Sequence, residues 1–271
     1  MIQKTQAIVL RRQEFRNTSL IVTFCTDQFG KVQGIVKGIR AERSRFASQL
    51  DVCDLNEIVF YERRASSLQL VTQAVLLEDL VGHPPNLATW PVATYFAELV
   101  NAVAAAHEPN AAVFQLLLSG LRSIAQALQP EDVARVFEVK LLSASGFMPR
   151  LRDCLHCNAS IQSTARLSVR LGGLLCERCH GEDRAARAIA PGTVATIAHL
   201  ERTPWAEALR LRLTAHARLE MRSILNEFLE FHLDRRFPSL TVLRSLLQDV
   251  ERRASWAATR VATTPAAPAI A

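Results

Sequence analysis

Four cysteines in two closely spaced pairs are the residues of this sequence with the clearest chemistry. Eighteen residues separate the pairs, so the pattern is C-x2-C-x18-C-x2-C, formed by Cys154, Cys157, Cys176 and Cys179. Each pair fits on one tight turn that directs both sulfurs toward the same point, and two such turns can enclose a metal ion in a tetrahedral sulfur shell. Zn²⁺ accepts such a shell readily. The sequence therefore predicts one zinc ion per chain.

The predicted zinc is structural and not catalytic. Four thiolates leave no open position for water, so the ion is expected to hold the fold together. An iron–sulfur cluster, a redox-active dithiol and a site that has lost its metal are the alternative interpretations. His156 and His180 lie beside the pairs, and we expect them to be neighbours of the metal shell and not ligands. The residues between the pairs alternate and then turn, as the hairpin of a zinc ribbon does.

The composition is that of an ordinary folded protein with a moderate basic excess. The chain has 271 residues, about half of them apolar, and a formal net charge of +6. This charge permits a polyanionic partner without requiring one. The sequence has neither an apolar run of membrane-spanning length nor a signal peptide, so we expect no membrane contact and a cytoplasmic location. Thiols stay reduced in that compartment, which favours metal over disulfides at the cysteine pairs.

Sequence motifs for catalysis are weak. The stretch from Gly34 to Gly38 lacks the spacing of a phosphate-binding loop, and neither GxSxG nor HExxH occurs. Cys25 and Cys53 are isolated in apolar runs, where small buried residues are more common than reactive thiols. We therefore expect a protein that is not an enzyme.

The first 82 residues have the pattern of a small β domain. Short apolar or alternating runs rich in Val, Ile and Phe are separated by turn-forming residues. Five strands in about eighty residues, without long helices between them, predict a barrel or a sandwich. The expected strands are residues 7–10, 20–25, 32–36, 55–61 and 68–76.

Beyond a break at residues 83–86, apolar residues recur with the period of an α-helix. We expect helices over residues 90–106 and 111–128, a third from Pro130 to Gly146, and further helices after Pro191. The predicted class is therefore α+β and multidomain. Its parts are a β domain (1–82), an α-helical domain (83–146 and 188–256, with a last helix over 240–253), an inserted zinc ribbon (147–187) and a disordered tail (257–271).

Positive charge is concentrated in two stretches of the β domain. Five cations between residues 31 and 45 face one acid, Glu42, and a second basic group in residues 11–16 is opposed by Glu14. Clustered cations suit a groove that follows a phosphate backbone, and Phe15, Phe46 and Tyr61 are available to stack on bases. A solvated polar face with ordinary core aromatics is the alternative. The predicted DNA-binding residues are Lys31, Lys37, Arg40, Arg43, Arg45, Arg11 and Arg12.

In their order and spacing, these segments resemble the RecO recombination-mediator family. The resemblance covers nearly the whole chain except the tail, and the Lys-Gly-x-Arg run at Lys37 to Arg40 supports the assignment of those two cations. It is carried by residues 6–10, 19–31, 36–40 with Ser44, 146–149, the two cysteine pairs and Phe231-His232-Leu233.

The resemblance implies an OB-fold barrel, followed by an α-helical domain with an inserted four-cysteine zinc ribbon. It also implies DNA repair and recombination by a nucleoid-associated protein that binds single- and double-stranded DNA and anneals complementary strands. The expected partners are RecR, the acidic C-terminal tail of single-stranded DNA-binding protein and, indirectly, RecA. Some relatives lack the cysteines, so the family's activity does not require zinc in general.

Two other classes of protein fit the same residues. One is a zinc-ribbon protein that binds RNA or acts in transcription, using the same barrel on RNA, and a preference for 2′-hydroxyl groups would identify it. The other is a protein-only scaffold whose basic residues serve solubility. Such a scaffold would not bind oligonucleotides even at low salt, whereas a DNA-binding mediator has an affinity that falls steeply as salt rises.

Overall fold

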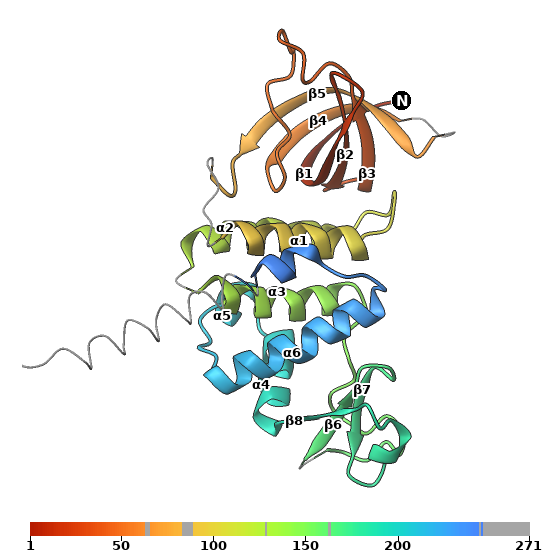
Figure 1. Ribbon diagram of the computed structural model, residues 1–271, viewed down its shortest axis with the longest axis vertical. Helices are drawn as coiled ribbons and strands as arrows, with labels where there is room; N and C mark the ends of the chain where they lie inside the picture. The colour runs from red at the N-terminus through yellow and green to blue at the C-terminus, as the bar shows by residue number, and fades with distance from the viewer. Residues whose placement is uncertain (63–65, 83–88, 128, 162–163, 244, 246–271) are drawn as a thin grey trace, which may run out of the picture.

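A computed structural model describes residues 1–62, 66–82, 89–127, 129–161, 164–243 and 245 of the chain. In Figure 1 a β-barrel forms one end of the molecule, a group of helices forms the middle, and a small three-stranded insert forms the other end. The expected tail (257–271) and most of the expected last helix lie outside the described residues. Residues 238–243 are helical.

Five strands close the N-terminal barrel in the order β1-β2-β3-β5-β4. Neighbouring strands are antiparallel except for β3 and β5, which pair in parallel with Ile35 opposite Leu70. This five-stranded closed barrel agrees with the OB-type fold that the resemblance implies. The strands are β1 (Ile2–Phe15), β2 (Ser19–Thr26), β3 (Gly30–Val36), β4 (Leu55–Tyr61) and β5 (Leu68–Glu78).

Alternation along the strands divides the barrel's side chains between two hydrophobic clusters. Ala7, Val9, Val22 and Phe24 belong to the cluster inside the barrel, whereas Ile8 belongs to the cluster that includes the helices. A β-bulge between Val9 and Arg11 then changes the register of β1 against β2. β1 pairs with β4 only up to Ile8, so its distal half, beyond the bulge, pairs with β2 alone.

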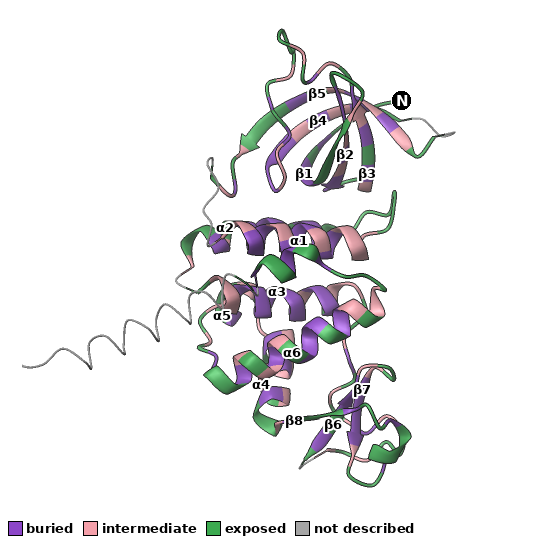
Figure 2. Ribbon diagram, in the orientation of Figure 1, coloured by how far each residue is buried: buried purple, intermediate pink, exposed green. Residues whose placement is uncertain are grey.

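The helical domain packs beneath the barrel around the largest hydrophobic cluster. In Figure 2 buried residues are most frequent on α1 and α3, which lie between the barrel and α6. The stacked rings of Phe96 and Phe137, with centroids 3.8 Å apart, join α1 to α3. The helices are α1 (Trp90–Val103), α2 (Ala111–Gln126), α3 (Pro130–Ala144), α4 (Pro191–Arg202), α5 (Trp205–Ala208) and α6 (Ala215–His232).

The cysteine-containing insert is a three-stranded antiparallel sheet in the order β7-β6-β8. Its hairpin, β6 (Ala165–Ser168) and β7 (Gly173–Cys176), agrees with the alternation seen in the sequence, and β8 (Arg187–Ile189) adds a strand that the sequence pattern did not predict. Leu167 and Leu174 join the core of the helical domain. The insert is therefore fixed to the helices by apolar packing.

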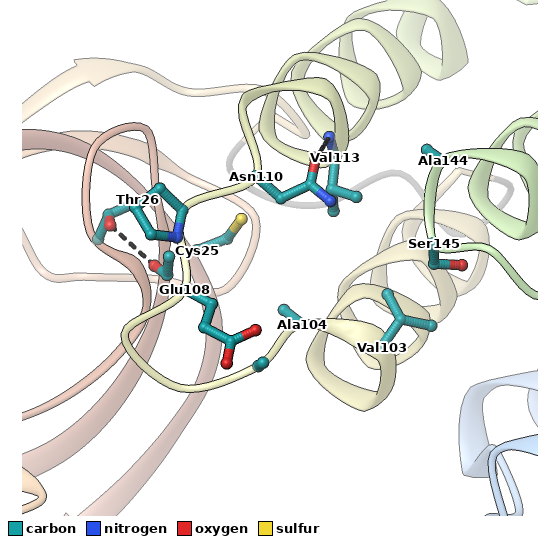
Figure 3. Close-up of a pocket in the computed structure, with 12 residues that line it drawn as sticks. Cys25, Thr26, Val103, Ala104, Glu108, Asn110, Val113, Ala144 and Ser145 are labelled. Carbon is teal, nitrogen blue, oxygen red and sulfur yellow. Dashed lines mark hydrogen bonds between the residues drawn. The ribbon is translucent and has the colours of Figure 1, made fainter.

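The loop between α1 and α2 attaches the helical domain to the barrel. The amide of Lys31 donates to the carbonyl oxygen of Ala105 (3.3 Å), and the amide of His107 donates to the carbonyl oxygen of Lys31 (3.1 Å). A cavity of about 230 Å³ lies at this junction, lined by barrel residues such as Cys25 and by the loop that carries Glu108 (Figure 3). Burial raises the pKa of the Cys25 thiol to about 12, so the thiol is neutral and unreactive.

Candidate metal centre and nucleic-acid interface

The four cysteines of the insert converge on one point. Their Sγ atoms all lie within 4.8 Å of one another, and those of Cys157 and Cys176 are 3.7 Å apart. Zinc–sulfur bonds of about 2.3 Å in a tetrahedron place neighbouring sulfurs slightly less than 4 Å apart. The donor set and its spacing therefore fit a four-coordinate thiolate site for a metal ion.

Two backbone turns hold the sulfurs in this arrangement. In the first knuckle, the amide of Asn158 donates to the carbonyl oxygen of Cys154 (2.9 Å), and Asn158 has the positive φ of 56° that the tight turn requires. In the second, Cys176 ends β7 and the amide of Cys179 donates to its carbonyl oxygen (3.0 Å). The amide of Leu155 donates to Leu174 (2.8 Å), which ties the first turn to the strand that leads into the second.

The surroundings of the sulfurs favour the thiolate at some cysteines of the cluster and oppose it at others. Desolvation opposes ionisation of Cys154, but hydrogen bonds from the backbone at Cys157, Cys176 and His156 outweigh it and lower the pKa of that thiol to about 6. At Cys179, desolvation and the neighbouring cysteines raise the pKa. Negative charge on one sulfur opposes ionisation of the next, and a divalent cation would remove this repulsion.

The two histidines beside the cysteine pairs contact other groups. Nδ1 of His156 lies 3.6 Å from the carboxylate of Glu182, and the ring of His180 is hydrogen-bonded to the carbonyl oxygen of Glu177. Among the described residues, the only cluster of metal-ligating side chains consists of the four cysteines. The expectation that these histidines are neighbours and not ligands agrees with this geometry.

Six of the seven predicted DNA-binding residues fall into two groups in the structure, and the seventh, Lys31, belongs to the junction between the domains. Arg12 forms an ion pair with Asp51, and Arg40 forms one with Glu14 (2.9 Å). The second group is exposed and has no ion pair among the described residues: Arg11, Lys37, Arg43 and Arg45. Their positive charge is therefore available to a polyanion, whereas that of Arg12 and Arg40 is partly offset.

We use the name basic loop for the segment from Lys37 to Arg45, which follows β3. The amide of Arg40 donates to the carbonyl oxygen of Thr18 (3.1 Å), so this loop is attached to the turn between β1 and β2. That turn carries Arg16, whose guanidinium lies 5.2 Å from the ring centroid of Phe15. The basic loop and the β1–β2 turn therefore place cations from separate strands at the same end of the barrel.

The aromatic residues near the cations differ in position. Phe46 packs against the interior of the barrel, and the guanidinium of Arg45 lies 5.7 Å from its ring centroid. Tyr61 pairs with Ile2, at the end of β1 opposite to Phe15. Phe15 and Phe46 are thus near the basic loop, and Tyr61 is far from it along β1.

Lys31 contributes to the junction between the domains. Its Nζ donates to the carbonyl oxygen of Asn101 in α1 (2.8 Å). Burial and, to a lesser degree, the charge of Arg235 lower the pKa of this ammonium. A role for Lys31 in binding DNA stays a prediction, since its side chain already has a structural partner.

The sequence indicates that Arg152 adds positive charge around the insert, but it does not indicate that Arg202 lies close to it. Arg152 precedes the first cysteine, and Arg202 ends α4, fifty residues later; both side chains line one small cleft. Arg152 and Arg202 are close because of the way the insert packs on the helical domain. The spacing of charges in the sequence does not indicate this packing.

A closed five-stranded barrel, a helical domain and an inserted sheet with four clustered cysteines together define a multidomain α+β protein with a candidate metal centre. No helix in the described part of the chain has the length and apolar character needed to span a membrane. The model of the family described as "Recombination protein O N terminal" matches residues 1–79, and that described as "Recombination protein O C terminal" matches residues 84–241. The chain belongs to the RecO family of DNA repair proteins.

Several relatives share most of their length with this chain. A "DNA repair protein RecO" from Moorella thermoacetica is 30% identical over 245 residues, which are 90% of this chain and 91% of the relative. The protein of the same description from Anaeromyxobacter dehalogenans (strain 2CP-C) is 32% identical, and the matched residues are 86% of this chain and 92% of the relative. The protein of the same description from Alkaliphilus metalliredigens is 28% identical, and the matched residues are 91% of this chain and 100% of the relative. Similarity therefore extends through the barrel, the insert and the helices.

Proposed function

We propose that this protein is a repair and recombination mediator that binds single- and double-stranded DNA and anneals complementary strands. With RecR, it would help RecA to load on strands covered by single-stranded DNA-binding protein, whose acidic tail it would contact. Membership of the RecO family supports a DNA repair role. The finer activities and partners are inferred from the resemblance of the sequence to that family.

The observation that carries the proposal is the uncompensated charge of the basic loop. Lys37, Arg43 and Arg45 are exposed and have no ion pair among the described residues, on a loop attached to the barrel. Two DNA strands repel each other through their phosphates, and fixed cations between them reduce this repulsion. Annealing would then be accelerated without covalent chemistry.

We further propose that Cys154, Cys157, Cys176 and Cys179 hold one Zn²⁺. The four sulfurs fit a tetrahedral shell with no position for water, so the ion would stabilise the insert and take no part in a reaction. Its effect on DNA binding would be indirect, through the position of the insert on the helical domain.

The decisive experiment measures annealing between complementary fluorescent strands coated with single-stranded DNA-binding protein. The full chain should accelerate duplex formation, and its affinity for a single strand should fall steeply as salt rises. A matched RNA strand tests the alternative class. Tighter binding to RNA, or no acceleration of annealing by a folded, metal-containing protein, would contradict the proposal.

A further inference from the structure

The junction between the zinc insert and α4 contains a cleft lined by three arginines. It has a volume of about 230 Å³ and lies beside the segment that leads into the first cysteine pair. We call it the arginine cleft. Its charged lining residues are Arg150, Arg152, Arg202, Asp153 and Glu201.

The backbone around the arginine cleft is held firmly. The amide of Arg150 donates to the carbonyl oxygen of Gly172 (3.0 Å), and its carbonyl oxygen accepts from the amide of Leu174 (3.0 Å). The carbonyl oxygen of Arg152 accepts from the amide of Ile161 (3.3 Å). Because the main chain is already ordered by these bonds, binding a ligand here would cost little additional backbone entropy.

The guanidinium groups are only partly offset by acids. Arg150 donates to the side-chain oxygen of Asn158 (2.9 Å), and its nearest carboxylate, that of Asp153, is 3.8 Å away. Arg202 donates to the carbonyl oxygen of Ala198 (3.0 Å), a neutral acceptor. Arg152 is exposed and has no ion pair in the part of the chain that the structure describes.

A lysine binds the carbonyl groups at the C-terminus of α4, which is the negative end of the helix dipole. Nζ of Lys140 donates to the carbonyl oxygen of Glu201 (2.9 Å) and to that of Thr203. Free carbonyl groups at a helix C-terminus would repel an anion, and here a cation binds them. Three arginines and two carboxylates line the cleft, which gives its lining an excess of one positive charge. Lys140 adds another positive charge beside the cleft, at the C-terminus of α4.

We propose that the arginine cleft binds phosphodiester groups of a nucleic-acid strand, as a second contact site in addition to the basic loop. This inference rests on the proposed function, because it concerns the same ligand. Guanidinium groups bind phosphate oxygens through paired, charge-assisted hydrogen bonds. The cleft lies where the insert joins α4. Figure 1 shows the insert at the end of the molecule away from the barrel. One strand long enough to contact both sites loses affinity when either is removed, and two shorter strands can occupy the sites separately during annealing.

The test compares Arg152→Glu with Arg184→Glu in the full chain. Both residues are exposed arginines of the insert, and both changes alter the net charge equally, but Arg184 does not line the cleft. Affinity for a fluorescein-labelled single-stranded oligothymidylate is measured over a range of salt. Arg152→Glu should weaken binding about tenfold and reduce the salt dependence, because a charge-assisted contact is lost. Arg184→Glu should lie within about twofold of the wild type, and Arg152→Lys should recover part of the affinity.

The outcomes separate the two proposals. Failure of the wild-type protein to bind the oligonucleotide would overturn the proposed function and this inference with it. The inference alone would be overturned if Lys37→Glu weakened binding of the oligonucleotide while Arg152→Glu had no larger effect than Arg184→Glu. The inference would also be overturned if Arg152→Glu lost affinity for a Glu/Asp-rich peptide but kept its affinity for the oligonucleotide. The cleft would then bind a protein segment. If Arg152→Glu loses its metal or helical signal, Arg202→Glu tests the same prediction.

Discussion

Gly30 lies directly against the main chain of Glu108, so closely that a β-carbon at Gly30 would overlap the Glu108 carbonyl group. Gly30 begins β3 in the barrel, and Glu108 belongs to the loop between α1 and α2. The two domains therefore meet backbone to backbone at this point, next to the hydrogen bonds that join Lys31 to Ala105 and His107. A contact of this kind fixes the angle between the basic loop and the helical domain.

Replacing Gly30 with Ala should destabilise this junction. Gly30 has a φ of +65°, which is unfavourable for a residue with a β-carbon, and the added methyl group would force Glu108 away. We expect a loss of about 2–4 kcal/mol in the free energy of unfolding, measured by denaturant titration. Hydrogen exchange should increase in the loop between α1 and α2.

Gly38 provides a matched control for this substitution. Its φ is +76°, but no other atom lies within 4 Å of the position that a β-carbon would take. Gly38→Ala therefore introduces the backbone strain alone, at about 1 kcal/mol. Equal losses for the two variants would mean that the close approach of Glu108 contributes nothing to stability.

Removal of one sulfur should release the metal. Protein purified under reducing conditions should contain one zinc per chain by elemental analysis, and Cys176→Ser should contain none. Hydrogen exchange should then increase in residues 147–187 and change less in the first eighty. Cys25→Ala is the control, because Cys25 is a buried cysteine outside the cluster. Full metal content in Cys176→Ser, or none in the wild type, would rule out the four-cysteine site.

Neutralising a cation of the basic loop should weaken DNA binding in a salt-dependent way. Lys37→Gln removes an exposed charge, and the slope of log affinity against log salt should fall by about 0.7 for each lost contact with a single strand. Lys4→Gln removes the same charge from the same barrel at a residue that is paired with Glu57 (2.8 Å). Its slope should match that of the wild type. The same slope for Lys37→Gln would place the binding surface elsewhere.

Local patterns in the sequence were sufficient to predict most of the elements. Alternating apolar residues predicted the five barrel strands, and the spacing of Phe114, Leu117 and Leu121 predicted a helix that the structure has as α2. The cysteine spacing predicted the metal cluster, because a C-x2-C turn is formed by residues that are adjacent in the chain. Signals of this kind depend on a few neighbouring residues.

Features that depend on distant partners were not predictable in this way. Lys31 was grouped with the DNA-binding residues, but its ammonium donates to Asn101, seventy positions later. The sequence did not indicate that Arg12 would pair with Asp51. Two further features also depend on residues far apart in the sequence. β3 pairs in parallel with β5, and Arg152 and Arg202 line the same cleft. Each follows from the tertiary arrangement and not from local periodicity.

A buried polar cluster joins three helices in the middle of the core. The hydroxyl of Tyr95 in α1 donates to Oε1 of Glu138 in α3 (2.8 Å), and Arg135 forms an ion pair with the same oxygen (2.8 Å). Asn226 in α6 lies against this group, with its Oδ1 3.4 Å from the Tyr95 hydroxyl oxygen. Oε2 of Glu138 is buried and has no hydrogen-bond partner among the described residues. A carboxylate is therefore poorly solvated at this position.

The pH dependence of stability should report on Glu138. Desolvation raises the pKa of its carboxyl group from 4.5 to about 7, although Arg135 and Tyr95 oppose the shift. The folded state therefore binds a proton that the unfolded state releases between these values, so stability is greatest below pH 4.5 with respect to this group and falls as pH rises toward 7. The loss amounts to about 3 kcal/mol at most. Denaturant titrations of the wild type and Glu138→Gln between pH 5 and 7.5 measure it, with Glu57→Gln as a control on the barrel surface. Glu138→Gln should show the flatter profile, and parallel profiles for all three proteins would mean that Glu138 is ionised in the folded core throughout.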